Sequence, residues 1–255
     1  MTDAQPLQFQ LAATPADSAE DLARADLYGL LATLLYRAPD AGLLQRIAAA
    51  PLDPADAAAA DPADAEAAAG SALTQAWRRL VARAGQTTAA QADDEYTELF
   101  IGVGKPEVFL YGSYYQAGFL NEKPLVVLRA DLRRYGLERA EGITETEDHL
   151  ATLCEVMRYL IAGEDAAVAH VAEQRTFFQR HLAPWAESAC DAVLQHPRAA
   201  FYAGVAGLAK AFLKSSGSPS SWRDGSRQGC LRTPPQPAKS EAPPASRRNG
   251  LWRGD

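Results

Sequence analysis

Apolar residues recur at the spacing of an α-helix along most of the chain, and no stretch shows the alternation typical of a β-strand. The first amphipathic stripe runs up to Tyr36, after a Ser18–Asp21 pair placed as a capping box. Further helices are predicted over 71–84, 88–100, 124–135, from a Thr144–Glu147 capping box to Gly163, and over 164–181, 184–196 and 197–214. The predicted fold is therefore all-α, a single globular domain of about eight to ten helices with no significant sheet.

The two ends of the chain differ in composition from this helical body. Of the 41 residues in 215–255, eight are Ser, six are Pro and five are Gly, so this stretch has little apolar surface to bury. We therefore expect a flexible N-terminus over 1–19, a helical domain over 20–214 and a disordered tail over 215–255. The tail fits a natural extension, a cloning scar or an altered reading frame equally well.

Charge is distributed unevenly between body and tail. The chain has 25 basic and 32 acidic residues, and 215–255 contains seven basic and three acidic ones, which leaves 18 against 29, or −11, for residues 1–214. An acidic body argues against nucleic acid as a partner and fits either a cationic partner or ordinary solubility. No run of 18 apolar residues and no secretory signal is present, so we expect a cytoplasmic protein without stable membrane insertion.

Candidate chemistry concentrates in the stretch ETEDH, residues 145–149. Glu147, Asp148 and His149 fit an acid/base pair, a metal site, a helix cap or a grip for a cationic partner. A metal site is disfavoured because no other histidine stands at ligand spacing. Cys154 lies on an apolar stripe, and G-x-S-x-G and phosphate-loop patterns are absent. We predict no metal and no cofactor.

Five separate segments resemble those of one family, the TorD/DmsD/NarJ family of redox-enzyme maturation chaperones. The segments are EYTELFIGVGKP (95–106), LYGSYY (110–115), TEDHLATL (146–153), HLAPW (181–185) and the His196, Pro197, Phe201, Tyr202, Leu208 pattern. The resemblance covers roughly residues 90–214, and the first helix, with Tyr28 and Tyr36, fits more loosely. Each motif is short, but their order and intervals agree.

The resemblance implies an all-helical cytoplasmic chaperone, not an enzyme, that is dedicated to a molybdoenzyme of the dimethyl sulfoxide or trimethylamine oxide reductase type or to a formate dehydrogenase. Its expected partners are the twin-arginine signal peptide and the apo-form of the catalytic subunit, whose cofactor insertion it assists before export. Some family members form domain-swapped dimers, so we expect a monomer or such a dimer. The alternative from the residues alone is a helical hydrolase, nucleotide-dependent or not, that uses Asp148 and His149.

The resemblance also implies a signal-peptide site. By position in the motifs, its residues are Asp148, His149, Glu147, Tyr96, Leu99, Phe100, Tyr111 and Ser113. Carboxylates suit the two guanidinium groups of the leader, and apolar residues suit the stretch that follows them. Asp148 is expected to be freer than Glu147, which a capping box would occupy. Tyr96, Tyr111 and Gly104 stand where some members have tryptophan, so we expect a differently shaped groove.

Overall fold

The computed structural model describes residues 15–52, 71–120, 122–140, 145–162, 170–217 and 252–254. Ten α-helices, one π-helical turn and two short strands make up this part of the chain. In chain order they are α1 (Pro15–Tyr36), α2 (Ala41–Ala48), α4 (Ala72–Ala84), α5 (Ala89–Tyr96), the π-helical turn η1 (Thr97–Ile101), α6 (Gly112–Ala117), α7 (Lys123–Arg134), β1 (Leu137–Arg139), α8 (Leu150–Ala162), α9 (Val171–His181), α10 (Ala186–Gln195), α11 (Phe201–Ser216) and β2 (Trp252–Gly254). The all-α prediction is confirmed.

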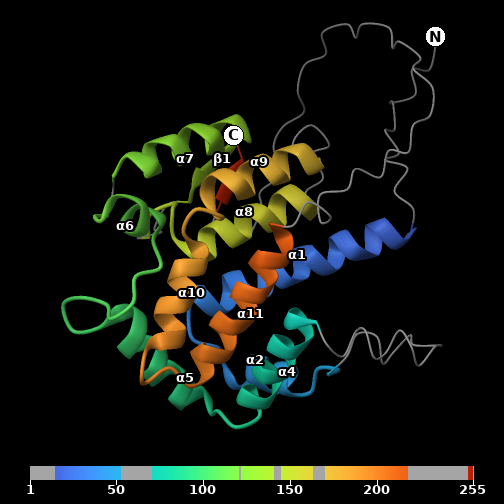
Figure 1. Ribbon diagram of the computed structural model, residues 1–255, viewed down its shortest axis with the longest axis vertical. Helices are drawn as coiled ribbons and strands as arrows, with labels where there is room; N and C mark the ends of the chain where they lie inside the picture. The colour runs from blue at the N-terminus through green and yellow to red at the C-terminus, as the bar shows by residue number, and fades with distance from the viewer. Residues whose placement is uncertain are drawn as a thin grey trace, which may run out of the picture.

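Helices α8 and α11 form the centre of the molecule (Figure 1). Helix α1 packs most extensively against α8, whereas α11 packs against α4 and α10. Tyr28 of α1 is fully buried and meets the edge of Phe212 of α11 at 4.7 Å between ring centroids. The apolar stripes predicted from sequence therefore meet in one core, because each helix turns its leucine- and aromatic-rich face inward.

Several helix ends follow the predicted signals. Ser71 caps α4 through the Thr74 N–H, and Thr88 forms a capping box with Gln91 at the start of α5. Two predicted caps are wrong in position. Helix α1 begins at Pro15, so Ser18 lies inside it, and α8 begins only at Leu150, so Glu147 precedes the helix.

The N-terminus of α11 is capped by a residue from a distant segment. The carboxylate of Glu95 accepts the backbone N–H groups of Ala200, Phe201 and Tyr202 at 2.8–2.9 Å. A negative group at a helix N-terminus satisfies otherwise unpaired donors and favours the helix dipole. This cap lets α11 begin at Phe201, four residues after Pro197, where sequence placed the start.

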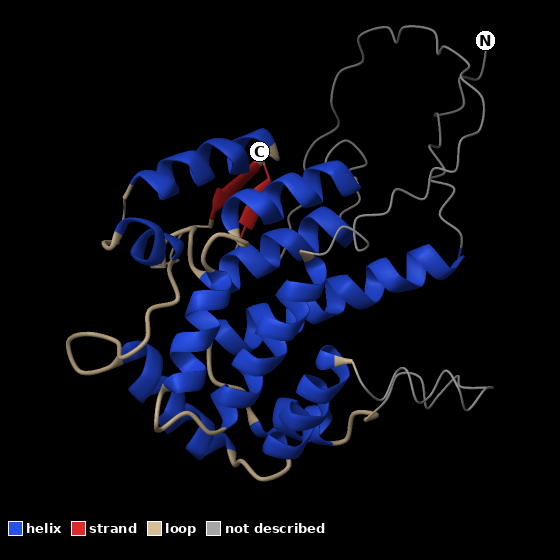
Figure 2. Cartoon of the chain, in the orientation of Figure 1, coloured by secondary structure: helices blue, strands red, loops and turns tan. Residues whose placement is uncertain are grey.

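The short strands β1 and β2 pair antiparallel, with Glu138 opposite Arg253, and they are the red segments of Figure 2. Of the predicted tail over 215–255, the structure describes residues 215–217, which complete α11, and residues 252–254, which form β2. The rest of that prediction lies outside the described residues, as do residues 1–14 of the N-terminus predicted to be flexible over 1–19. Its bound at residue 19 is wrong, because residues 15–19 already belong to α1. No helix in the described ranges is both long and apolar enough to cross a membrane.

Candidate functional site

Asp148 is a buried link between two segments rather than an open carboxylate. Its Oδ2 accepts the backbone N–H of Ser113 at 2.7 Å, and its Oδ1 accepts the hydroxyl of Thr146 at 2.6 Å. Its carbonyl oxygen accepts the Gly112 N–H at 3.0 Å, and the residue is only 3% exposed. Asp148 therefore holds the start of α6 against the turn that precedes α8. The expectation that it would be freer than Glu147 is wrong, because both of its oxygens already accept hydrogen bonds.

His149 caps α8 and stays neutral. Its Nδ1 accepts the Ala151 N–H at 3.2 Å, so the ring proton lies on Nε2. Burial lowers the pKa of His149 to about 4, although the nearby carboxylates of Glu145 and Asp148 oppose that shift. The ring meets that of Tyr111 edge-on at 4.9 Å between centroids. At neutral pH this buried histidine is uncharged and supports the ring of Tyr111.

Glu147 pairs with a cation from α7. Its Oε2 accepts Arg129 Nη2 at 2.9 Å, and Glu147 is buried while Arg129 remains partly exposed. The predicted capping partner, Thr144, lies outside the described residues. Glu147 is thus already paired, and its carboxylate fixes α7 beside the 145–149 turn.

The predicted apolar site residues separate into buried and half-buried members. Leu99 is fully buried in the core, and Ser113 is fully buried with no hydrogen-bond partner for its Oγ in the described structure. Tyr96 and Phe100 are half-buried, and their rings meet at 5.2 Å between centroids. Tyr96 also donates its hydroxyl proton to the Tyr36 carbonyl at 2.7 Å, which joins η1 and α5 to the end of α1. Only the half-buried rings present surface to a ligand.

Sequence reasoning missed a carboxylate, Glu145, that acts electrostatically on several of these rings. Glu145, which is half-buried, raises the pKa values of Tyr36, Tyr96 and Tyr111 alongside the larger effect of burial, and that of Tyr111 reaches about 12. Glu145 also acts electrostatically on His149. We call Glu145, Tyr36, Tyr96, Tyr111 and His149 the Glu145 cluster. Its signal was present in the sequence, because Glu145 opens the ETEDH stretch, but nothing local placed Tyr36 beside it.

The Glu145 cluster has the chemistry of a cation-binding surface. A carboxylate supplies negative charge, and the tyrosines are neutral at pH 7, as phenols with pKa values of 10 or above are. Aromatic ring faces attract guanidinium groups, and planar guanidinium groups pair well with carboxylates. The cluster therefore suits an arginine-bearing ligand better than an anion.

The same geometry gives little support to the hydrolase alternative. Asp148 is saturated with hydrogen bonds and His149 is buried and used as a cap, so neither is placed to accept a proton from a substrate. Burial raises the pKa of the Cys154 thiol, which keeps it protonated. Within the described ranges, no group of three or more His, Cys, Asp or Glu side chains is arranged to hold a metal ion.

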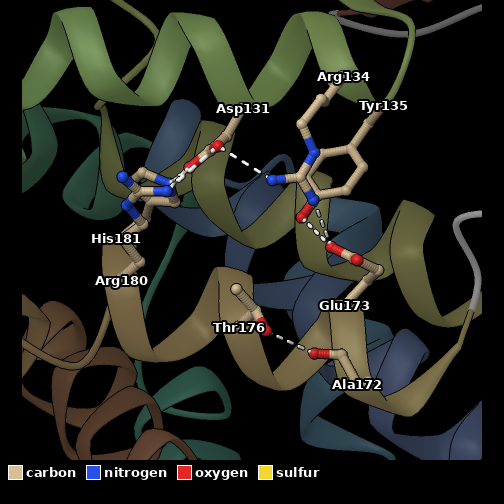
Figure 3. Close-up of polar contacts among 8 residues, drawn as sticks. All are labelled: Asp131, Arg134, Tyr135, Ala172, Glu173, Thr176, Arg180 and His181. Atoms are coloured by element: carbon tan, nitrogen blue, oxygen red, sulfur yellow. Dashed lines mark hydrogen bonds and ion pairs between the residues drawn. The ribbon is translucent and has the colours of Figure 1, made fainter.

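A second polar cluster joins α7 to α9 (Figure 3). Asp131 is buried, and its carboxylate accepts hydrogen bonds from Arg180 Nη1 at 2.9 Å and from His181 Nε2 at 2.8 Å. One turn further along, Glu173 accepts bonds from Arg134 and Tyr135 at 2.9 and 2.8 Å. Because every group in this cluster is paired with another, the cluster fixes α7 to α9 within the fold.

The fold and the site define an all-helical protein with an acidic, aromatic surface around the 145–149 turn and no catalytic arrangement among its described residues. Residues 66–191 match the family described as nitrate reductase delta subunit. The chain is 29% identical over 128 residues to the chaperone protein TorD of Aliivibrio fischeri, a match that covers 47% of this chain and 60% of that protein. It is 27% identical over 150 residues to the chaperone protein TorD of Vibrio cholerae, covering 56% and 67%. These matches confirm the resemblance to the TorD/DmsD/NarJ family.

Proposed function

We propose that the chain is a chaperone for molybdoenzyme maturation that binds the twin-arginine leader of its client in the cytoplasm and assists cofactor insertion before export. The observation that carries the proposal is the half-buried carboxylate of Glu145 beside the Tyr111–His149 ring contact, with an electrostatic effect on Tyr36, Tyr96 and Tyr111. Matches to chaperones named TorD support the same class of function. The hydrolase alternative has no comparable support.

In the proposed complex, the leader arginines contact the Glu145 cluster. One guanidinium pairs with Glu145 and stacks on the ring of Tyr96 or Tyr111. The apolar part of the leader then lies along the 97–108 segment, where Phe100 is half-buried and Ile101 and Val103 are exposed. The acidic body adds a long-range attraction for a cationic peptide.

The other predicted site residues support this surface from beneath. Asp148 holds Ser113 and α6 in place through its hydrogen bonds, and Leu99 anchors η1 in the core. Glu147 neutralises Arg129, which would otherwise repel the leader. We therefore keep these residues in the proposed site as positioning residues, with the direct contacts assigned to the Glu145 cluster and Phe100.

The test is calorimetric titration of a twin-arginine leader peptide and of its Lys-Lys variant. We expect the wild type to bind the Arg-Arg peptide more tightly, because ammonium groups pair and stack less well than guanidinium groups. Glu145→Gln should weaken the Arg-Arg peptide about 3- to 30-fold, the range between an exposed and a partly desolvated ion pair.

Glu20→Gln is the matched control, because Glu20 is an exposed carboxylate on α1. It removes the same net charge and should change affinity less than about two-fold. If both variants weakened peptide binding equally, the loss of affinity would be due to the net charge of the protein and not to Glu145 itself. Wild-type affinity in Glu145→Gln would remove this carboxylate from the site.

A further inference from the structure

A groove with apolar walls lies between α1, α4 and α11, and we call it the α1/α4 groove (Figure 1). Its volume is about 410 Å³. Its apolar lining consists mainly of half-buried side chains from α1 and α4 and a buried leucine from α11: Leu27, Leu30, Leu73, Trp77 and Leu208. Among the described residues that line the groove, Asp26 is the one that carries a charge. Such a surface suits apolar side chains better than a polar ligand.

The polar side-chain groups on the α4 wall already have hydrogen-bond partners. Trp77 Nε1 donates to the carbonyl oxygen of Pro51 at 2.9 Å. The hydroxyl of Thr74 is hydrogen-bonded to that of Ser71 at 2.6 Å. A ligand in the groove therefore gains little from hydrogen bonds to these groups, and its affinity has to come from apolar area removed from water.

Helix α1 has apolar residues on two faces. Tyr28 and Leu31 are fully buried in the core. Ala23, Leu27 and Leu30 line the groove at the spacing i, i+4 and i+7, which places them on one side of the helix. The core therefore uses one apolar face of α1, and the other face borders the groove.

The sequence directly before α1 has the composition that the groove requires. Residues 4–15 read AQPLQFQLAATP and contain no charged side chain, in a chain of which 22% of the residues are charged. Leu7, Phe9 and Leu11 supply three large apolar side chains within five residues. Residues 53–70, which also adjoin the groove in sequence, instead contain five acidic residues and no large apolar one. Burying that segment would bring carboxylates into an apolar site, which is costly.

The geometry of the chain allows this segment to reach the groove. Helix α1 begins at Pro15, and a helix rarely continues through the residue before a proline, so we expect the chain to change direction there. Phe9 precedes Pro15 by about 20 Å of extended chain, and Leu27 follows it by about 18 Å of helix. The corresponding lengths for Leu11 and Ala23 are about 13 and 12 Å. A segment that folds back along α1 therefore brings its apolar side chains level with those of the groove.

We propose that residues 7–11 fold back along α1 and occupy the α1/α4 groove, with the ring of Phe9 against Leu27 and Trp77. The segment covers apolar surface that would otherwise be available to other chains. It also joins α1 to α4, whose main packing is against α8 and α11, respectively. The contact involves no residue of the Glu145 cluster, so it does not depend on leader recognition.

Acrylamide quenching of Trp77 fluorescence in the full chain tests this contact. The chain has four tryptophans, so the Trp77 signal is the difference between each protein and its Trp77→Phe counterpart. Phe9→Asp should raise the quenching constant of Trp77 about two-fold or more, because a carboxylate is excluded from an apolar groove. Gln10→Asp is the matched control, since it adds the same charge next to Phe9 on a side chain that is already polar. It should change the quenching constant less than about 1.2-fold.

A synthetic peptide of residues 4–14, titrated by calorimetry into the full chain, gives a second readout. It should bind Phe9→Asp about ten-fold or more tightly than it binds the wild type, whose own segment competes at a high effective concentration. Adding Ala23→Asp to Phe9→Asp places a charge in the groove and should weaken the peptide about ten-fold. Adding Leu22→Asp is the control, because Leu22 is 57% exposed and lies outside the groove lining. It should change the peptide affinity less than about two-fold.

Three results would overturn the inference. The first is equal quenching of Trp77 in wild type and Phe9→Asp, or no binding of the 4–14 peptide to Phe9→Asp. The second is protection of Trp77 that increases with protein concentration, which would assign the groove to a second copy of the chain. The third is protection of Trp77 by a twin-arginine leader peptide and not by the 4–14 peptide, which would assign the groove to a client. Failure of the leader to bind at the Glu145 cluster would leave both readouts unchanged, so the two proposals fail separately.

Discussion

The 145–149 turn and helix α7 lie side by side and use their charges in opposite ways. In the turn, Asp148, Glu147 and His149 are buried and bonded within the protein, and Glu145 stays half-buried among rings. On α7 the buried Asp131 is bonded to α9, while Lys123 and Arg133 are exposed and have no ion-pair partner in the described part of the chain. Residues that look functional in sequence can thus be structural. The surfaces available to a ligand are set by the residues that the core does not occupy.

The largest expected loss of stability comes from removing the carboxylate of Asp148, which joins the 145–149 turn to the start of α6. Asp148→Ala leaves the buried Ser113 N–H without its acceptor and frees the Thr146 hydroxyl. We expect a loss of about 2–3 kcal/mol in the free energy of unfolding, measured by urea denaturation, together with weakened leader binding.

Glu147→Gln is the comparison for that variant, because its partner Arg129 is partly exposed. We expect it to cost less than about 1 kcal/mol. On α7, Val126→Asp should leave the unfolding free energy unchanged within about 0.5 kcal/mol. A similar stability for Asp148→Ala and wild type would contradict the structural role of Asp148.

Lowering the pH should reduce the free energy of unfolding by a comparable amount. His149 has a folded-state pKa of about 4 against 6.5 for the ordinary group, so the unfolded chain binds more protons between these values. Stability from this group is complete above pH 6.5 and declines as the pH falls toward 4. The decline amounts to about 2–3 kcal/mol for a shift of this size.

His149→Asn isolates that contribution. Asparagine retains a side-chain acceptor for the Ala151 N–H, since it is a favoured N-cap, but it does not titrate. Urea unfolding at pH 7 and pH 4.5 should show a smaller difference for the variant than for wild type. His181, whose pKa is also lowered by burial, contributes a pH dependence of the same direction in both proteins.

The smallest expected effect concerns the end of the chain beside α7. A chain that ends at Gly217 lacks β2, whose strand pairs with β1 directly after α7. Three residues of pairing contribute little, so we expect the unfolding free energy to fall by less than about 1 kcal/mol. The cut belongs after Gly217, because Ser216 is buried at the end of α11. A loss of several kcal/mol would show that the tail packs against the body and would extend the α7 region to include it.

Sequence alone determined the helical class and most helix positions, and it pointed to the stretch that we propose as the site. Helical periodicity and caps such as Ser71 and Thr88 are local properties, so they can be read from neighbouring residues. The ETEDH stretch was recognisable because it concentrates acids around a histidine. These features depend on residues only a few positions apart.

Only the tertiary structure showed which of those acids are buried and bonded within the protein. Asp148 accepts a hydrogen bond from Ser113, 35 residues earlier. Glu147 accepts one from Arg129, 18 residues earlier. Glu145 acts electrostatically on Tyr36, more than 100 residues earlier in the chain. Hydrogen bonds and burial satisfy buried polar groups wherever the fold brings partners together, and that pairing leaves no local pattern in the sequence. The exposed valines on α7 could not be predicted from sequence either. They have the spacing of core residues, and only the packing of the helix shows that they lie on the outside.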